Sequence, residues 1–196
     1  APGMLSGNTM FLPWPKASGQ TLAVTHQGTG KPWLTVQSLA AVPRTAPLSA
    51  GYRVRRSVEP VEQADKRLPA GQYSRGDVLR VTLEVDASAD MTWVAITDPI
   101  PGGATILGSG LGRDSEIATQ GEKRAGNGWL AFEERSFEAF RSYYAYLPEG
   151  KVKLQYTIRL NNAGSFALPP TRVEALYAPE MFGESPNAPV RVLQGK

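Results

Sequence analysis

The chain has 196 residues, 41% of them hydrophobic, and a net charge of +3 from 21 basic and 18 acidic residues. Basic and acidic residues are interspersed, whereas nucleic-acid binding requires basic residues clustered on one face, so the sequence does not predict that function. The absence of cysteine excludes disulfides, thiolate metal ligands and cysteine nucleophiles, and no apolar stretch reaches the roughly 18 residues of a membrane span.

Glycine and proline are unusually frequent and predict a fold built from strands. The 20 glycines and 16 prolines make up about 18% of the chain, against a usual ~12%. Such a composition favours many short strands joined by turns, and helix formers do not recur at helical spacing for long. The first residues, APGMLSGNTM, lack the charged start and apolar centre of a signal peptide. We interpret the chain as a piece of a longer protein.

The sequence of residues 1–57 predicts three short strands. They are expected at 21–26, 33–40 and 51–58, and the first two should form a hairpin across the turn GTGKP. One face of the third strand carries Tyr52, Val54, Arg56 and Val58. Three strands with so little apolar content are marginal as an independent domain. We therefore expect residues 1–57 to complete a sheet whose other strands lie elsewhere in the longer protein.

Residues 58–196 predict a self-sufficient antiparallel β-sandwich. The cleanest alternation of apolar and polar residues lies in DVLRVTLEVD (77–86) and KVKLQYTIRL (151–160). Further strands are expected at 91–97, 104–107, 129–134, 136–147, 171–177 and 190–193. A long irregular segment, 108–128, separates two groups of strands, and loops of that length are usually functional or mobile.

Two apolar stretches are candidates for contact with another domain. Tyr144 and Tyr146 share one face of their strand and Tyr143 lies on the other, and both core packing and interdomain contact remain open. In FALPPTRVEALYAPEMFG (166–183), Val173, Ala175 and Tyr177 are expected to face the core, with Pro179 ending the strand. Met181 and Phe182 then lie beyond the strand, where they are the better candidates for an interdomain contact.

No motif predicts a cofactor or metal site. The single histidine, His26, has no carboxylate nearby in sequence to orient it. GTGK (28–31) lacks the spacing of a phosphate loop, and GSGLG (108–112) lacks the surrounding strand–turn–helix unit of a dinucleotide site.

The carboxylates likewise predict no catalytic set. Glu133 and Glu134 are adjacent, so on a strand they face opposite sides and cannot flank one substrate. Asp98 precedes Pro99 and is expected to cap a turn with its side chain. We expect no catalytic, cofactor-binding or metal-binding residue, and hence no enzyme.

Long ordered strings in the sequence resemble the C-terminal region of bacterial alpha-2-macroglobulins. They include HQGTGKPW, SAGYRVRRSVEPVE, SRGDVLRVTLEVDASADMTWVAITDPIPGGATILGSGLGRDS, ERSFEAFRSYYAYLPEGK and YTIRLNNAGSFALPPTRVEALYAPEMFGE, and they cover the chain from about Thr21 onward. The resemblance implies that residues 1–57 are the end of the thioester-domain region and the returning strands of a CUB-type domain. Residues 58–196 are then the last macroglobulin-like sandwich, of fibronectin/Ig-like architecture.

The resemblance also implies a function. In this family a large periplasmic protein, often anchored to the inner membrane by an N-terminal lipid, traps proteases that cleave its bait region. In thioester-bearing members a Cys–Gln thioester then links to the attacker. This chain has no cysteine, so such a thioester lies outside it.

By resemblance, the expected role is non-catalytic: the sandwich packs against the thioester domain, helps to shield it and moves on bait cleavage. The partners are the thioester domain and other domains of the parent chain, and target proteases are met only through the full-length protein. The candidate contact residues are Tyr143, Tyr144, Tyr146, Tyr177, Met181 and Phe182. The alternatives are an independent extracytoplasmic adhesion or ligand-binding module, and a hydrolase that uses His26.

Overall fold

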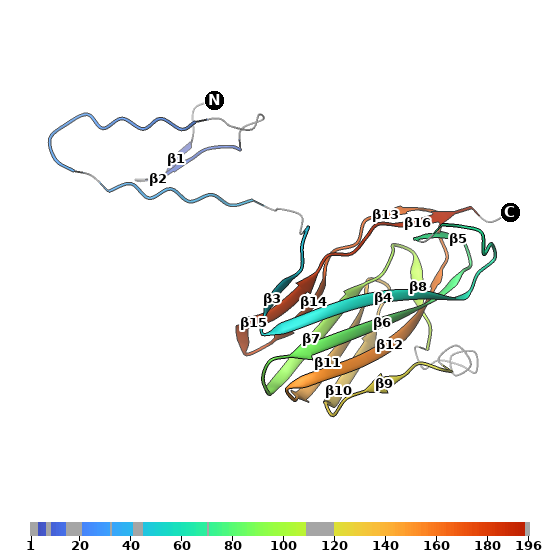
Figure 1. The fold of residues 1–196 in the computed structure, drawn as a ribbon. Coiled ribbons are helices and arrows are strands. Elements are labelled where there is room, and N and C mark those ends of the chain that lie inside the picture. The colour runs from blue at the N-terminus through green and yellow to red at the C-terminus, as the bar shows by residue number, and fades with distance from the viewer. Residues whose placement is uncertain are drawn as a thin grey trace. The chain divides into compact units, whose positions relative to one another are not determined.

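The computed structural model describes residues 4–6, 9–14, 21–31, 33–40, 45–69, 71–108 and 120–194. The chain divides into two compact units, Ala1–Ala41 and Val42–Lys196. Figure 1 labels the strands of both units. No described helix is long and apolar enough to cross a membrane.

The first unit contains one small sheet. Strands β1 (Met4–Ser6) and β2 (Thr9–Phe11) pair antiparallel. The strands that we predicted at 21–26 and 33–40 do not form, because the described residues there carry no strand pairing. The apolar side chains of these segments stay in solvent, as Trp33 does at 100% exposure. Pairing these two segments would bury little apolar surface, so the alternation of their residues is not sufficient to form strands.

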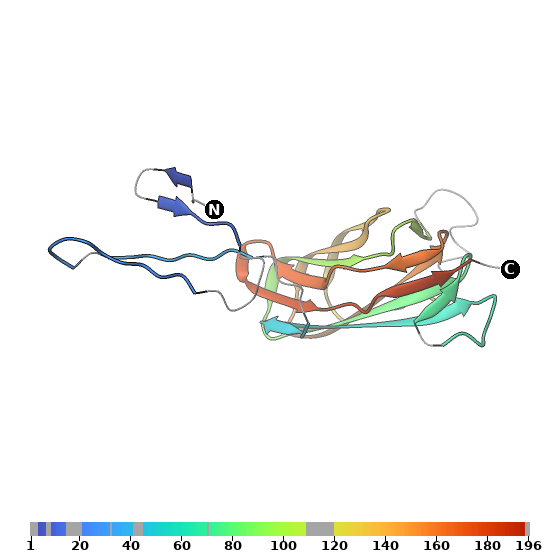
Figure 2. The same cartoon turned by 90° about the horizontal axis from the view of Figure 1, so that it is seen from above.

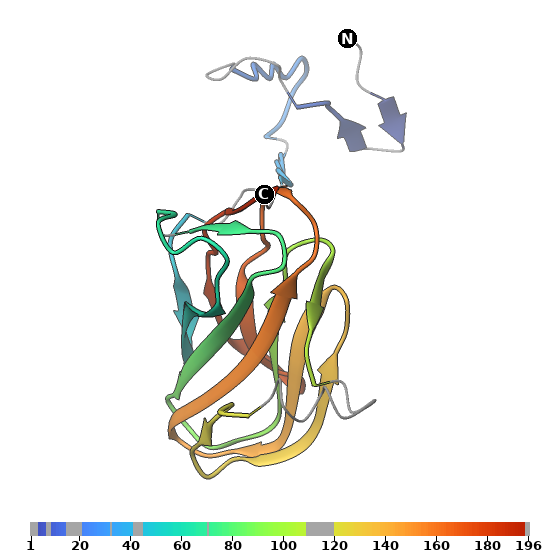
Figure 3. The ribbon, with the colours of Figure 1, turned by 90° about the vertical axis from the view of Figure 1, so that its right-hand side faces the viewer.

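The second unit is a sandwich of antiparallel sheets, shown from two further sides in Figures 2 and 3. One layer contains β3 (Leu48–Ala50), β7 (Met91–Pro99), β10 (Trp129–Arg135), β11 (Ala139–Leu147), β14 (Thr171–Ala175) and β15 (Ala178–Ser185). Their order across this sheet is β10-β11-β7-β14-β15-β3. The predicted all-β, antiparallel sandwich is confirmed.

The opposite layer contains β4 (Tyr52–Glu62), β6 (Val78–Ala87), β8 (Ala104–Ile106), β9 (Arg124–Ala125) and β12 (Gly150–Leu160). Its order is β4-β6-β12-β8, and β9 also pairs with β12. A small third sheet joins β13 (Gly164–Phe166), β16 (Val190–Leu193) and β5 (Gln72–Ser74), in which β16 and β5 are parallel.

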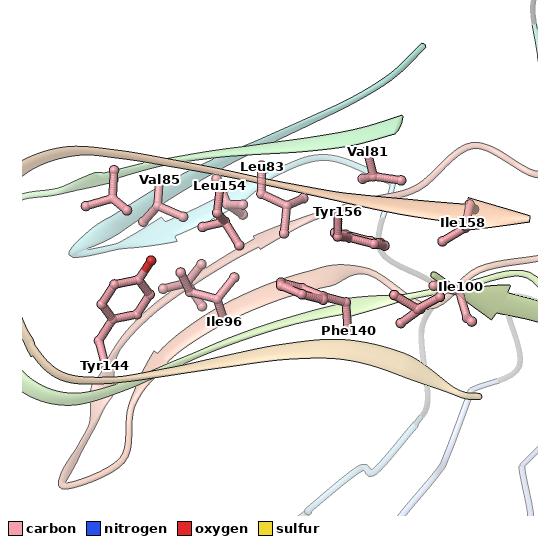
Figure 4. Close-up of a cluster of buried hydrophobic side chains, with 14 of the residues drawn as sticks. Val81, Leu83, Val85, Ile96, Ile100, Phe140, Tyr144, Leu154, Tyr156 and Ile158 are labelled. Atoms are coloured by element: carbon pink, nitrogen blue, oxygen red, sulfur yellow. The ribbon is translucent and has the colours of Figure 1, made fainter. Parts of the chain in front are cut away.

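The hydrophobic core fills the space between the two large sheets (Figure 4). The two strands with the cleanest alternation, β6 and β12, pair through Leu83 and Leu154 and through Val81 and Tyr156. All four of these side chains are fully buried. Burying a side chain of this size stabilises the fold by about 1.5–3 kcal/mol, so the inward face predicted for each strand accounts for much of its stability.

Gly51 is the corner at which the chain passes from one sheet to the other. The strand before it, β3, pairs with β15, and the strand after it, β4, pairs with β6. The backbone φ of Gly51 is 96°, which favours glycine. An added Cβ would also lie 2.4 Å from the Cε atom of Met181, so the end of the Met181 side chain would have to move to admit one.

The sandwich begins earlier in the sequence than we expected. The boundary placed between residues 57 and 58 falls inside β4, which pairs with β6 from Tyr52 to Glu62. Tyr52 and Val54 lie in the sandwich core, which explains why this strand needs the second unit and not the first. The assignment of the preceding residues to a thioester-domain region and CUB-type strands stays a prediction.

The hairpin of β14 and β15 differs from the predicted strand at 171–177. Val173 and Ala175 face the core as expected, but β14 ends at Ala175 and Tyr177 is 80% exposed in the turn. Pro179 does not end a strand, because it belongs to β15. The pairing jumps from Glu174–Phe182 to Ala175–Ala178, so Pro179 lies in an irregularity where no ladder hydrogen bond is required of it.

A candidate interdomain surface and a buried polar cluster

The three tyrosines of β11 have different environments. Tyr144 is 2% exposed and lies in the core, so it offers no surface to another domain; burial raises the pKa of its phenol. Tyr143 and Tyr146 are half-buried. The Tyr143 ring stacks on Phe132 at a centroid distance of 6.2 Å, and the Tyr146 ring lies 5.9 Å from Trp129.

The hydroxyl of Tyr146 is held by an acidic side chain. It donates a hydrogen bond to Asp90, which raises the pKa of Tyr146. The Asp90 carboxylate also accepts from the backbone N–H of Glu149 at 2.8 Å, and this bond lowers the pKa of Asp90. The ring of Tyr146 is therefore held at its hydroxyl end and lies at an angle of 59° to the Trp129 ring.

The two candidate contact residues at 181–182 also lie in different environments. Met181 is half-buried, packs against the core and fills the space above Gly51. Phe182 pairs with Glu174 and carries the Arg172 guanidinium 4.9 Å from its ring centroid. Met181 thus serves the core. Phe182 and the exposed Tyr177 remain accessible.

A row of charged side chains crosses the outer face of the six-stranded sheet. Strand registers align Glu134, Arg141, Thr97, Arg172 and Glu184 in this order. Arg141 pairs with Glu134 at 2.8 Å, Arg172 pairs with Glu174 at 2.9 Å, and Arg172 also pairs with Glu184. Opposite charges facing each other across strands stabilise a sheet modestly. The charges of this row are therefore largely satisfied within the domain.

The sequence did not identify the most exposed apolar residues at the β10 margin of this sheet, which lie on both of its faces. Trp129, Leu130 and Phe132 on β10 are 72%, 40% and 59% exposed, and Phe137 in the following turn is 80% exposed. The sequence predicted a strand here, but alternation alone does not tell an edge strand from a central one. Trp93 is also exposed, and its backbone φ of 53° is rare for a bulky residue.

Asp98 lies at the centre of a buried polar cluster. We had predicted that its side chain caps a turn, and that prediction is wrong. Its carboxylate accepts from Nε of Arg56 at 2.8 and 3.1 Å and from the hydroxyls of Tyr156 and Thr171. Burial and the nearby Asp98 charge raise the pKa of Tyr156, whose ring stacks on Phe140 at 4.3 Å. The cluster joins both large sheets, because Arg56 and Tyr156 come from one and Asp98 and Thr171 from the other.

This cluster is structural in its chemistry. Three donors already occupy the Asp98 carboxylate, which leaves it no role as a base for a bound substrate. A cavity of about 330 Å³ lies beside Arg56 and is lined partly by Tyr73, Pro101 and Asn187. Within the described ranges, no group of three or more His, Cys, Asp and Glu residues could hold a metal ion.

A second set of ion pairs connects the two sheets at the β10 margin. Arg135 pairs with Glu122 at 2.8 Å and with Glu133 at 2.7 Å, and it also donates to the carbonyl of Leu107 at 2.5 Å. Arg124, on β9, pairs with Glu133. These contacts occupy the charged C-terminal half of β10 and leave its apolar N-terminal half, Trp129 to Phe132, outside the network.

Several solved structures of similar fold come from one class of protein. The chain superimposes on trypsin-activated alpha-2-macroglobulin of Escherichia coli with a TM-score of 0.59 and 19% identity, covering 75% of this chain and 11% of that one. It matches native E. coli alpha-2-macroglobulin, spanning domain MG7 to the C-terminus, with a TM-score of 0.57 and 20% identity, covering 76% and 24%. The fold is therefore that of a macroglobulin-type β-sandwich.

Sequence comparison makes the assignment specific. Residues 51–180 match the family described as Bacterial Alpha-2-macroglobulin MG10 domain, and the chain belongs to this family. It is 34% identical over 132 residues to alpha-2-macroglobulin of Pasteurella multocida, covering 66% of this chain. It is 26% identical over 111 residues, or 56% of this chain, to an alpha-2-macroglobulin homolog of Nostoc. The chain spans about 6% of the length of either relative.

Proposed function

We propose that this chain is the C-terminal MG10 region of a periplasmic, broad-spectrum protease inhibitor, in which it acts without a catalytic group of its own. The observation that carries the proposal is the match of residues 51–180 to the MG10 domain of bacterial alpha-2-macroglobulins. The parent protein is anchored to the inner membrane by an N-terminal lipid. Target proteases meet this domain only as part of the whole inhibitor.

The role that we propose for the domain is to pack against the thioester domain of the parent, to shield it and to move when a protease cuts the bait region. Excluding water from a thioester slows its hydrolysis, and this requires apolar and aromatic side chains at the contact. The outer face of the six-stranded sheet supplies such groups in Phe132, Tyr143 and Phe182. The ion pairs on the same face are satisfied internally, so docking need not leave those charges unpaired.

The Asp98 cluster favours a structural and non-catalytic role for the interior of the domain. It ties the two sheets together through a carboxylate with three donors, which favours a domain that moves as a rigid body. A rigid sandwich can be displaced from its neighbour as one piece when the parent rearranges.

The test compares the isolated chain with the full-length parent against trypsin-like and elastase-like proteases. The isolated chain is expected to leave both proteases active, and the parent is expected to inhibit them after its bait region is cut. Substantial inhibition by the isolated chain, or none by the parent, contradicts the proposal.

The shielding role has its own measurement in a parent that carries a Cys–Gln thioester. Deleting residues 42–196 is expected to accelerate the reaction of the thioester with water or with a small amine at least tenfold. A parent that lacks the domain but keeps an equally slow thioester reaction would show that the shield lies elsewhere. The binding of a defined soluble periplasmic partner by the isolated chain would instead favour an independent adhesion module.

A further inference from the structure

The two large sheets end in strands of very different surface chemistry. At the margin of one sheet, β4 presents Arg53 and Arg55 to solvent and contains Pro60. Charged residues and proline are the usual means by which an edge strand avoids pairing with another chain. The first half of β10, at the margin of the other sheet, has the sequence WLAF and contains neither charge nor proline.

This half of β10 is available for pairing. Among the described residues, β10 has a single neighbour in its sheet, β11. The charged half of the strand is occupied, because Glu133 and Arg135 form ion pairs with Arg124 and Glu122 and Glu134 pairs with Arg141. What remains is the β10 edge patch, which we define as Trp129, Leu130 and Phe132 of β10 together with the neighbouring Tyr143 and Tyr146 of β11. Phe132 and Tyr143 lie on the outer face of the sheet and Trp129 and Tyr146 on the opposite face, so the patch borders the free edge of β10 on both sides.

We propose that the β10 edge patch is the docking surface for an apolar, extended segment of another domain of the same parent chain. This inference rests on the proposed function and names the surface that function uses. The similar E. coli structure spans domain MG7 to the C-terminus and this chain covers 24% of it, so the matching region there is part of a longer chain. The backbone N–H and C=O groups on the free side of β10 supply hydrogen bonds to such a segment, and the aromatic rings supply apolar contact.

The size of the patch favours a tethered partner over a free one. The exposed parts of its side chains offer on the order of 400 Å², about half of the ~800 Å² that each partner buries in a stable interface. A separate protein or a second copy of this chain would bind so small a surface weakly. A domain of the same polypeptide meets it at an effective concentration in the millimolar range, at which a small interface is sufficient.

The chemistry of the patch also defines the occupant. Its five side chains carry no formal charge, and the hydroxyl of Tyr146 is already bonded to Asp90. An anionic segment would lose hydration here and would also meet the neighbouring Asp90 carboxylate, and the patch side chains offer no counter-charge to either sign. The occupant is therefore a strand or extended loop of aliphatic or aromatic residues.

The experiment places the photocrosslinking residue benzoylphenylalanine at position 132 of the full-length parent. The matched control places it at Val61 on β4, which is 49% exposed on the edge strand of the opposite sheet. We expect Phe132→benzoylphenylalanine to crosslink within the same polypeptide to an apolar segment of another domain, at a yield at least fivefold above the control. Crosslinks only to a second copy, crosslinks only to residues 1–196 (including 109–119), or a yield equal to the control would each overturn the proposal.

Amide hydrogen exchange provides a readout that does not depend on an unnatural residue. The free-side amides of residues 129–132 are expected to exchange at least tenfold more slowly in the parent than in the isolated chain, because a docked strand protects them. Equal rates overturn the inference. Normal protease inhibition with an unprotected, uncrosslinked β10 rejects this inference alone, whereas docking at β10 in a parent without inhibitory activity rejects the proposed function alone.

Discussion

Asp98→Ala is expected to destabilise the sandwich by about 4 kcal/mol. The substitution removes the carboxylate that pairs the Arg56 guanidinium, and the Arg56 side chain is only 10% exposed. Breaking a buried ion pair by deleting one partner costs about 3–5 kcal/mol, because the remaining charge is left buried and uncompensated. The hydroxyls of Tyr156 and Thr171 also lose their acceptor, which places the effect in the upper half of that range.

Thermal and denaturant unfolding of the isolated chain measure this effect. A domain of this size loses about 2–4 °C of melting temperature per kcal/mol, so the Tm should fall by roughly 8–16 °C. The matched control is Glu134→Ala, which breaks a partly exposed ion pair with Arg141 of similar length. That control should cost less than about 1 kcal/mol, because solvent screens the pair.

The double variant Asp98→Leu, Arg56→Met separates the cost of an unpaired charge from the value of the cluster itself. Replacing both members of a buried pair with apolar residues of similar size is often neutral or stabilising. We expect the double variant to be clearly more stable than Asp98→Ala. The reasoning is refuted if Asp98→Ala changes stability by less than about 1 kcal/mol, or if the double variant is as unstable as the single one.

Three further predictions concern other buried positions. Burial raises the pKa of Tyr52 to about 12. Since the pKa of the unfolded tyrosine is about 10, the stability that neutral Tyr52 contributes is complete below pH 10. About 2–3 kcal/mol of stability is then lost as the pH rises to 12. Tyr52→Phe should flatten the fall in Tm over this range, and an unchanged pH profile would contradict the assignment. Gly183→Ala should cost about 1–3 kcal/mol in urea unfolding, because its Cβ would lie 2.4 Å from the Tyr52 carbonyl oxygen. The control Gly102→Ala, whose Cβ would meet Phe166 at 3.6 Å, should be nearly neutral, and equal costs at both glycines would refute the steric argument. Arg135→Ala should cost about 2–3 kcal/mol, because it leaves two partly buried glutamates without their shared cation; a loss below 0.5 kcal/mol, measured by the same unfolding, would show that solvent screens this network.

Local pattern was sufficient to predict the class of fold. Alternation in β6 and β12 identified the inward faces, because a strand between a core and solvent exposes every second residue. The same rule placed Arg56 on the face of Tyr52 and Val54, which the structure confirms. It could not reveal why a cation is tolerated there, since the answer is Asp98, which lies 42 residues away.

The remaining errors share a physical cause. The hairpin predicted at 21–40 has good alternation, but its described apolar residues stay exposed, and alternation carries no information about whether another layer covers them. The exposure of Trp129 and Phe132 depends on β10 lying at the end of its sheet, which is decided by long-range pairing of strands. Tyr177 was assigned to the core because the pairing irregularity in the β14–β15 hairpin has no distinctive sequence pattern.

The corner at Gly51 has a mechanical consequence. Tension applied to the chain ahead of Leu48 acts first on β3, which is three residues long and, among the described strands, pairs with β15 alone. Beyond the corner, β4 is anchored by its long pairing with β6 and by the buried Tyr52. A pulling force should therefore detach β3 well before it disturbs the core, so that the rest of the domain stays folded while this short strand is lost.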